Sequence, residues 1–160
     1  MNQVATKKLF QQVACPTENH PGELSWVSLS TVENENWFVN STLAAAAAKS
    51  LHTCLEHTNA QVLAWVLLPD QLQILLQAGS NCCAQEAIRK LKVSTAIAVN
   101  KSAHREMGLI GPLWHYNYQI QPVYRRQCAQ QVGMNIIRQP QRLGLVDNYC
   151  SYPYWNSIWT

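Results

Sequence analysis

The sequence predicts an α+β fold, a ferredoxin-like sandwich in which helices pack on a central antiparallel sheet of four or five strands. Strand-like apolar patterns and helical patterns follow one another in the order β-α-β-β-α-β-α. Two of the strands, residues 61–68 and 71–77, are joined by only two residues, so they must pair antiparallel. We expect this hairpin at the centre of the sheet, with helices at residues 43–57 and 83–101 covering one face.

Length and composition predict a single globular domain. The 160 residues can bury a substantial core, and 48% of them are hydrophobic while only 13% are charged. Residues 1–22 contain Pro16, Pro21 and Gly22 and are expected to form a loosely ordered N-terminal arm, with residues 23–160 as the domain. The chain shows neither a secretory signal nor an apolar run of roughly 20 residues, which predicts a cytoplasmic protein without membrane contacts.

The first strand and the first helix have clear local signals. Residues 23–32 alternate between two sets of side chains, which predicts a strand. Ser41 or Thr42 is the expected N-terminal cap, because a hydroxyl can accept a hydrogen bond from a free helix N–H group. Five consecutive alanines then favour the helix at residues 43–57.

The central hairpin carries two amides in an unusual position. Residues 62–68 are almost all Val, Leu, Ala and Trp, as in a strand buried on both faces. Pro69 and Asp70 favour the turn. In the next strand Gln71 and Gln73 share one face, because side chains alternate across a strand. This pair indicates either a solvated strand end or a functional site.

The second half of the chain predicts a helix at residues 83–101, a strand at 111–123, a helix at 124–138 and an aromatic tail over the sheet edge. In the predicted strand, Trp114, Tyr116 and Tyr118 fall on one face. These rings either belong to the core or form a platform on which bases stack.

Positive charge is concentrated in the second half. Residues 1–78 have three basic and six acidic side chains, whereas residues 79–146 have nine basic and two acidic ones. Such asymmetry indicates either a solubilising face or a surface for a polyanion. The residues predicted to bind nucleic acid are Arg89, Lys90, Lys92, Lys101, Arg105, Arg125, Arg126 and Arg138, together with Trp114, Tyr116 and Tyr118.

The six cysteines do not form a metal-binding or disulfide pattern. There is no C-x-x-C pair, and the ligand-like spacing of Cys54 and His57 has no second half at zinc-finger distance. We expect free thiols.

Several motifs resemble those of a known transposase family. They are the hairpin at residues 61–77, RKLKVSTAIAVNKSAHREMGLIGPLW at 89–114, NIIRQPQRLGLV at 135–146 and SYPYWNS at 151–157. In this order they are similar to the REP-associated tyrosine transposases of the single-tyrosine HUH superfamily. The resemblance spans residues 24–157. Dimers are common in the superfamily, so the resemblance allows a homodimer.

The resemblance implies a chemistry whose key groups are absent here. In the family two histidines hold Mg²⁺ or Mn²⁺, which polarises a DNA phosphate, and a tyrosine attacks the phosphorus. The matching positions are Gln71 and Gln73 for the metal and Asn135 for the nucleophile. We therefore expect no cofactor, no intact catalytic residue, and a transposase-like pseudoenzyme that retains binding to single-stranded or hairpin DNA. The three amides are expected to converge on one pocket.

Two alternatives remain open from the sequence. The chain is an active strand-transferase if Tyr116, Tyr118 or Tyr124 acts as a displaced nucleophile, with His115 or Asp70 as a metal ligand. It is a vestigial or protein-interaction domain if DNA binding is lost as well.

Overall fold

The computed structural model describes residues 22–106, 108, 111–124 and 126–160. The expected N-terminal arm at residues 1–22 lies almost entirely outside this part, so its structure stays a prediction. Within the described residues the strands are β1 (Leu24–Ser30), β2 (Gln61–Leu68), β3 (Gln71–Gln77), β4 (Gln119–Val123) and β5 (Trp155–Ser157). The helices are α1 (Ser41–Thr53), α2 (Ala84–Glu106), α3 (Arg126–Ile137) and α4 (Gln139–Arg142), with short 3₁₀ turns at Val32–Asn34, Trp37–Val39 and Tyr149–Ser151.

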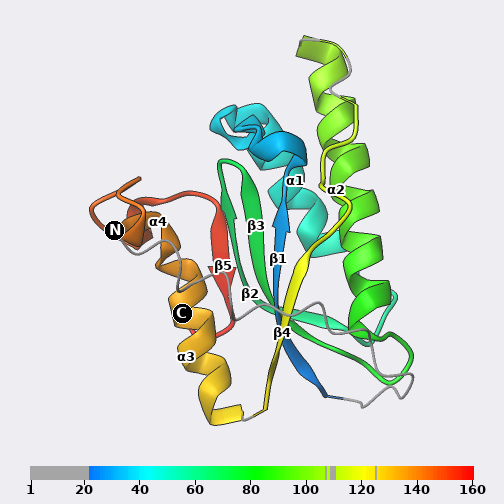
Figure 1. Ribbon diagram of the computed structural model, residues 1–160, viewed down its shortest axis with the longest axis vertical. Helices are drawn as coiled ribbons and strands as arrows, with labels where there is room; N and C mark the ends of the chain where they lie inside the picture. Colours follow the sequence, from blue (N-terminus) through cyan, green and yellow to red (C-terminus); the bar gives the residue numbers. More distant parts are fainter. Residues whose placement is uncertain (1–21, 107, 109–110, 125) are drawn as a thin grey trace.

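The described strands form one antiparallel sheet in the order β4-β1-β3-β2-β5 (Figure 1). The first four strands in sequence thus have the 4-1-3-2 arrangement of a ferredoxin-like sandwich, and β5 extends it at the β2 edge. This confirms the predicted fold class. The hairpin of β2 and β3 is flanked by strands on both sides, as predicted. None of the described helices is both long and apolar enough to cross a membrane.

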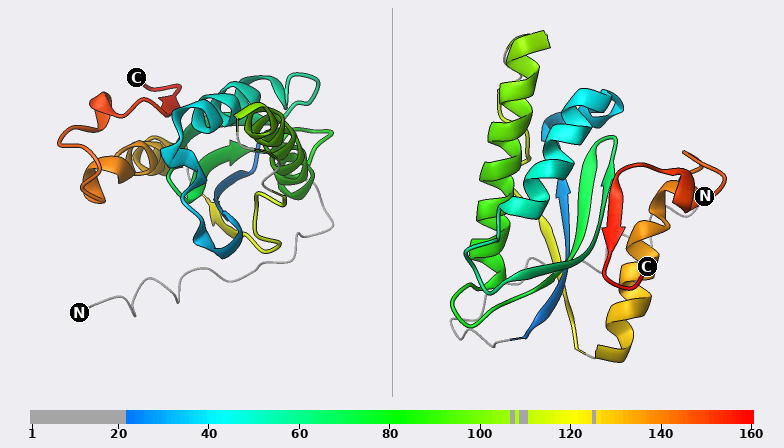
Figure 2. Two further views of the ribbon diagram at one scale, coloured as in Figure 1. Left: turned by 90° about the horizontal axis from the view of Figure 1, so that it is seen from above. Right: turned by 180° about the vertical axis from the view of Figure 1, so that it is seen from behind.

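Helices α1 and α2 cover one face of the sheet, as the sequence predicted (Figure 2). Small side chains at Ala44 and Ala47 are buried there, which lets α1 lie close to its neighbours. The predicted cap was wrong. Asn40, rather than Ser41 or Thr42, accepts from the Thr42 and Leu43 N–H groups, because its amide oxygen reaches both free donors.

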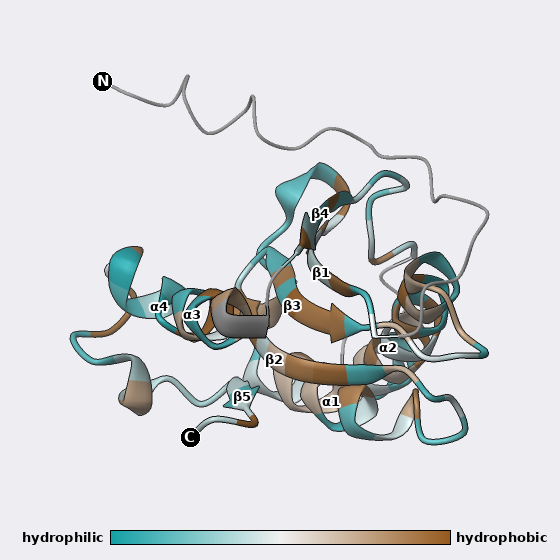
Figure 3. Cartoon of the chain, turned by 90° about the horizontal axis from the view of Figure 1, so that it is seen from below, coloured by the Kyte–Doolittle hydropathy of each residue, from teal (hydrophilic) through white to brown (hydrophobic). Residues whose placement is uncertain are grey.

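Helix α3 covers the opposite face and forms a second, smaller core (Figure 3). Ile136 and Ile137 are buried against β2 residues that include Val66 and Leu68. The helix approaches the sheet closely at Gly133, where a Cβ atom would lie 3.3 Å from Ala64 Cβ and 2.6 Å from the Trp159 ring.

The predicted strand at residues 111–123 is largely wrong, because β4 begins only at Gln119. Gln119 pairs with Ser28, and Trp114 makes an isolated bridge with Thr31. Five residue steps on one strand therefore oppose three on β1. The four residues 115–118 thus lie opposite only two of β1 and form a bulge, which we call the 115–118 excursion.

The aromatic tail packs at the sheet edge, as predicted, and it also contributes a strand. β5 pairs with β2 at residues 64–66. The Tyr152 hydroxyl donates to the Leu67 carbonyl at 2.7 Å, and Leu67 N–H donates to the Tyr154 carbonyl at 2.9 Å. These bonds satisfy the outer edge of β2, and burial raises the pKa of Tyr152 to about 12, so its hydroxyl stays a donor.

Candidate nucleic-acid interface

Gln71 and Gln73 lie on the face of β3 that is turned toward α3. They alternate with Leu72 and Ile74, which face α1 and α2, and they share their face with Leu75 of the α3 core. The Ser28 hydroxyl donates to Gln71 Oε1 at 3.3 Å. Gln73 Oε1 is buried and has no hydrogen-bond partner in the described part of the chain.

Asn135 lies on α3, on the same side of the sheet as the two glutamines. It is half-buried, and its Oδ1 accepts a hydrogen bond from Arg142 Nη2 at 2.8 Å. Among the described residues no hydrogen bond joins Asn135 to Gln71 or Gln73. The structure thus places the three amides on the same side of the sheet, two in β3 and one in α3, and their convergence on a single pocket stays a prediction.

Lys92 of α2 holds the 115–118 excursion against the helix. Its ammonium group donates to the carbonyl oxygens of His115 at 2.9 Å and Tyr116 at 3.1 Å. It also lies 5.8 Å from the centre of the Tyr118 ring, within cation–π range. Burial lowers the pKa of Lys92. One basic side chain therefore fixes the shape of the excursion.

The predicted aromatic platform is divided between the core and the surface. The Trp114 side chain is 7% exposed, packs 5.6 Å from the Phe38 ring and donates its indole N–H to Thr95 Oγ1 at 2.7 Å. Tyr116 is 90% exposed, and Tyr118 is half-buried beneath Lys92. The aromatic residues do not share a face because the bulge breaks the strand alternation.

The predicted basic residues occupy both sides of the sheet. Arg89, Lys90, Lys92, Lys101 and Arg105 are on α2, and Arg89 forms a salt bridge of 2.7 Å with Glu86. Arg138 follows α3 on the opposite side, Arg126 is the first residue of α3, and Arg125 lies outside the described residues. The excursion therefore adjoins the α2 group rather than Arg138.

The groups considered for displaced catalysis are scattered. Tyr124, like Tyr116, is 90% exposed, whereas Asp70 lies in the β2–β3 turn. His115 Nδ1 accepts from the Asn117 N–H at 3.1 Å. Where the structure describes the chain, it brings together no group of three or more His, Cys, Asp or Glu side chains that could hold a metal ion.

A cavity beside Asn135 was not predicted from the sequence. Its volume is about 500 Å³, and it is lined by Arg138, Gln141, Arg142 and Tyr149; we call it the arginine cavity. Hydrogen bonding to the Cys150 side chain raises the pKa of Tyr149, although Arg138 opposes the shift. Asn135, Arg138 and Arg142 are spaced i, i+3 and i+7, and this helical spacing is the signal that could have revealed the group.

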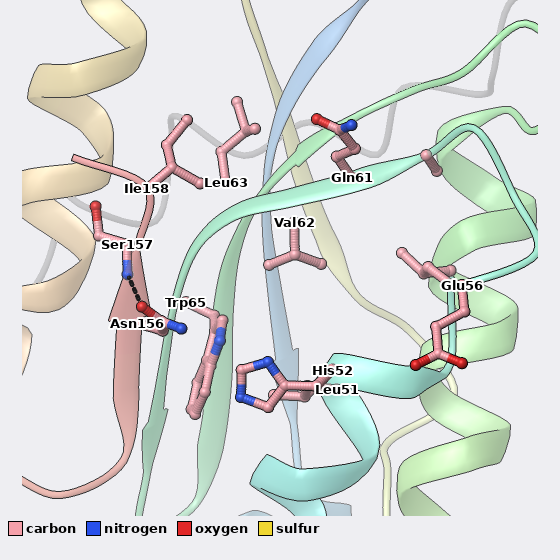
Figure 4. A pocket seen from close by; sticks show the side chains of 12 residues that line it. Leu51, His52, Glu56, Gln61, Val62, Leu63, Trp65, Asn156, Ser157 and Ile158 are labelled. Atoms are coloured by element: carbon pink, nitrogen blue, oxygen red, sulfur yellow. Dashed lines mark hydrogen bonds between the residues drawn. The ribbon is translucent and has the colours of Figure 1, made fainter. Parts of the chain in front are cut away.

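A second cavity, also of about 500 Å³, lies on the α1 side at the β2–β5 edge (Figure 4). Trp65 and His52 lie side by side in it, with ring centres 6.0 Å apart, and Glu56 and Asn156 add polar groups to its rim. It is separated by the sheet from Gln73 and Asn135.

The chain resembles solved transposase structures. It superposes with a TM-score of 0.71 on a REP-associated tyrosine transposase bound to a REP hairpin, at 10% identity, covering 90% of this chain and 82% of that one. A transposase candidate from Deinococcus radiodurans gives a TM-score of 0.55 at 16% identity, covering 79% of this chain and 98% of that one. No family model and no curated protein matches the sequence. At these identities the likeness shows a shared transposase fold.

Proposed function

We propose that this protein is a transposase-like DNA-binding protein that lacks catalysis and binds single-stranded or hairpin DNA. The observation that carries the proposal is a transposase fold in which amides occupy the three positions that the resemblance assigns to the metal ligands and the nucleophile. These amides are Gln71, Gln73 and Asn135. The REP-associated relative was solved with a hairpin, and that supports the choice of ligand.

The residues present do not fit the divalent metal that the fold implies. An amide oxygen is a weak neutral ligand compared with imidazole, and Gln71 Oε1 already accepts from Ser28. Asn135 has no hydroxyl that could attack phosphorus, and its oxygen is bonded to Arg142. Both steps of the implied reaction therefore lack their chemical group.

DNA binding is supported by charge and by the shape of the excursion. Helix α2 carries five basic residues, and Lys92 fixes the backbone from which Tyr116 projects into solvent. An exposed ring beside positive charge can stack on an unpaired base while the cations contact phosphates. A duplex offers no unpaired base, so the proposal favours single strands and hairpin loops.

A gel-shift series with hairpin, single-stranded and duplex DNA of one composition tests the binding. We expect hairpin and single-stranded DNA to bind more tightly than the duplex. On single strands, the logarithm of the affinity should fall by about 0.7 per phosphate contact for each unit of the logarithm of the salt concentration. Lys101→Ala should reduce both the affinity and this slope. Lys49→Ala, which removes another exposed lysine, from α1, is the matched control. If none of the DNA forms binds at low salt, the protein is not a DNA-binding protein and the vestigial or interaction-domain alternative is favoured.

A denaturing gel tests the absence of catalysis. After incubation with single-stranded DNA and Mg²⁺ or Mn²⁺, we expect neither cleavage nor a covalent adduct. An adduct at Tyr116, Tyr118 or Tyr124 would instead establish a displaced nucleophile. In the reverse direction, Gln71→His with Gln73→His should create metal affinity, whereas nicking should also require Asn135→Tyr.

A further inference from the structure

The arginine cavity lies where helix α3 meets the short helix α4. Helix α3 leads into α4, and the Arg142 N–H donates to the Arg138 carbonyl at 3.1 Å across the junction. The Arg142 side chain reaches back across this junction to Asn135 Oδ1 at 2.8 Å, so the two residues lie on the same side of it. Arg138 and Arg142 both line the cavity.

The two guanidinium groups have no acidic counterpart in the described part of the chain. The ion pair found there joins Arg89 to Glu86 on the other side of the sheet. Arg138 and Arg142 thus place two exposed like charges four residues apart, which is mildly unfavourable and would be relieved by an anion. Two arginines around one cavity match the oxygens of a phosphate group, which they can contact through paired N–H donors.

Neutral groups hold both arginines in place. Arg142 donates to Asn135 Oδ1, and the Arg138 guanidinium lies 5.9 Å from the centre of the Tyr149 ring. The backbone N–H of Tyr149 donates in turn to Gln141 Oε1 at 3.4 Å, which links Tyr149 to α4. A neutral amide orients a guanidinium without cancelling its charge, whereas a carboxylate at the same position would compete with the ligand.

We propose that the arginine cavity binds a phosphate group of a single-stranded nucleic-acid chain, with Arg138 and Arg142 contacting its oxygens and Asn135 as a positioning residue for Arg142. The identity of the polymer rests on the proposed function, whereas the phosphate site rests on the cavity itself. Asn135, which stands at the position that the transposase resemblance assigns to the nucleophile, would thereby help to bind a ligand.

Small probes test the site without long DNA. Thymidylyl-thymidine, which has one phosphodiester, thymidine 5′-phosphate and inorganic phosphate are titrated into the protein, and binding is followed by calorimetry and by NMR signals of the arginine side chains. We expect a nucleotide probe to shift the Arg142 signal. Arg138→Ala and Arg142→Ala should each weaken binding by roughly tenfold or more, the loss expected for a charge-assisted hydrogen bond. Lys49→Ala should bind normally.

Asn135 variants separate positioning from a purely structural role. Asn135→Asp keeps the hydrogen bond to Arg142 but neutralises its charge, so it should bind phosphate more weakly than the unmodified protein. Asn135→Ala keeps the charge of Arg142 but removes the hydrogen bond that orients its side chain. Its affinity for phosphate should therefore lie between that of the two arginine variants and that of the unmodified protein. If Asn135→Asp binds as tightly as the unmodified protein, Asn135 does not position a phosphate-binding arginine. Circular dichroism of each variant checks that it is folded.

The results of these phosphate-binding experiments can be told apart from those that test DNA binding. Preference for the dinucleotide assigns the site to an internal phosphate, and preference for the mononucleotide assigns it to a strand end; both support the inference. It is overturned if no probe binds, if only inorganic phosphate binds, or if neither arginine variant weakens binding. If long DNA binds the protein but Arg142→Ala leaves it unchanged, the proposed function stands and the phosphate site fails.

Discussion

The two faces of strand β3 have opposite compositions. Toward α1 and α2 it presents Leu72, Ile74 and Leu76, all fully buried in the larger core. Toward α3 it presents Gln71 and Gln73 before Leu75 joins the smaller core. Because both faces belong to the same seven residues, a single strand can stabilise the fold on one side and present polar groups on the other.

The difference means that polar residues on the α3 side can be substituted without disturbing the larger core. Burial on the α1 and α2 side does not depend on which polar residue occupies position 71, 73 or 135. The larger core should thus keep its stability when the polar residues at those positions are substituted. Substitutions on the two faces should therefore have effects of very different size.

The largest effect is expected on the apolar face. Ile74→Ala removes a side chain with no exposed surface from between Val27 and Trp65, the neighbours that β1 and β2 place beside it. Lost burial and the remaining cavity should lower the free energy of unfolding by about 2–5 kcal/mol. Urea denaturation followed by circular dichroism measures the change. Gln73→Ala, one position away on the other face, is the comparison and should lower the free energy of unfolding far less. If both variants lose the same stability, the two faces do not differ in how much they stabilise the fold.

An intermediate effect is expected where α2 holds the start of the excursion. Thr95→Val keeps the size of the side chain but removes the oxygen that accepts from the buried Trp114 indole. Leaving that donor unpaired should cost about 1–3 kcal/mol. Thr95→Ser retains the hydroxyl and is the control. If Thr95→Val and Thr95→Ser have the same stability, the hydrogen bond does not anchor Trp114.

Most of the fold could be predicted from the sequence, because periodicity reports which side chains face a core. The apolar run of β2, the alternation of β3 and the helical spacing of α2 all result from burial, and burial dominates folding. The Pro69–Asp70 turn then fixed the antiparallel pairing. β5 was not predicted as a strand because three residues are too few to show a period.

Features that depend on pairing across the sheet could not be predicted in this way. Residues 115–118 alternate perfectly in sequence, yet the registers on either side of them differ by two residues. Asn135 was identified only through resemblance, and its contact with Arg142 depends on how α3 continues into α4. The spacing of Arg138 and Arg142 was visible, but their lack of an acidic partner is a property of the folded chain.

The smallest effect, and the one that best sharpens the comparison, is expected from Gln73→Leu. Gln73 Oε1 is buried without a hydrogen-bond partner among the described residues, and such an atom costs about 1–3 kcal/mol. Leucine has a similar size and no polar atom that needs a hydrogen bond. We therefore expect the free energy of unfolding to rise by about 1 kcal/mol, or Tm by roughly 2–4 °C for a chain of this length.

Gln71→Leu is the matched control, because it removes the acceptor of the Ser28 hydroxyl and should not raise the stability. Thermal unfolding of both variants measures the difference. A loss of stability in Gln73→Leu would mean that the amide has a partner in solution, and Asn135, on the same side of the sheet, would then be the first candidate to test by a double-mutant cycle.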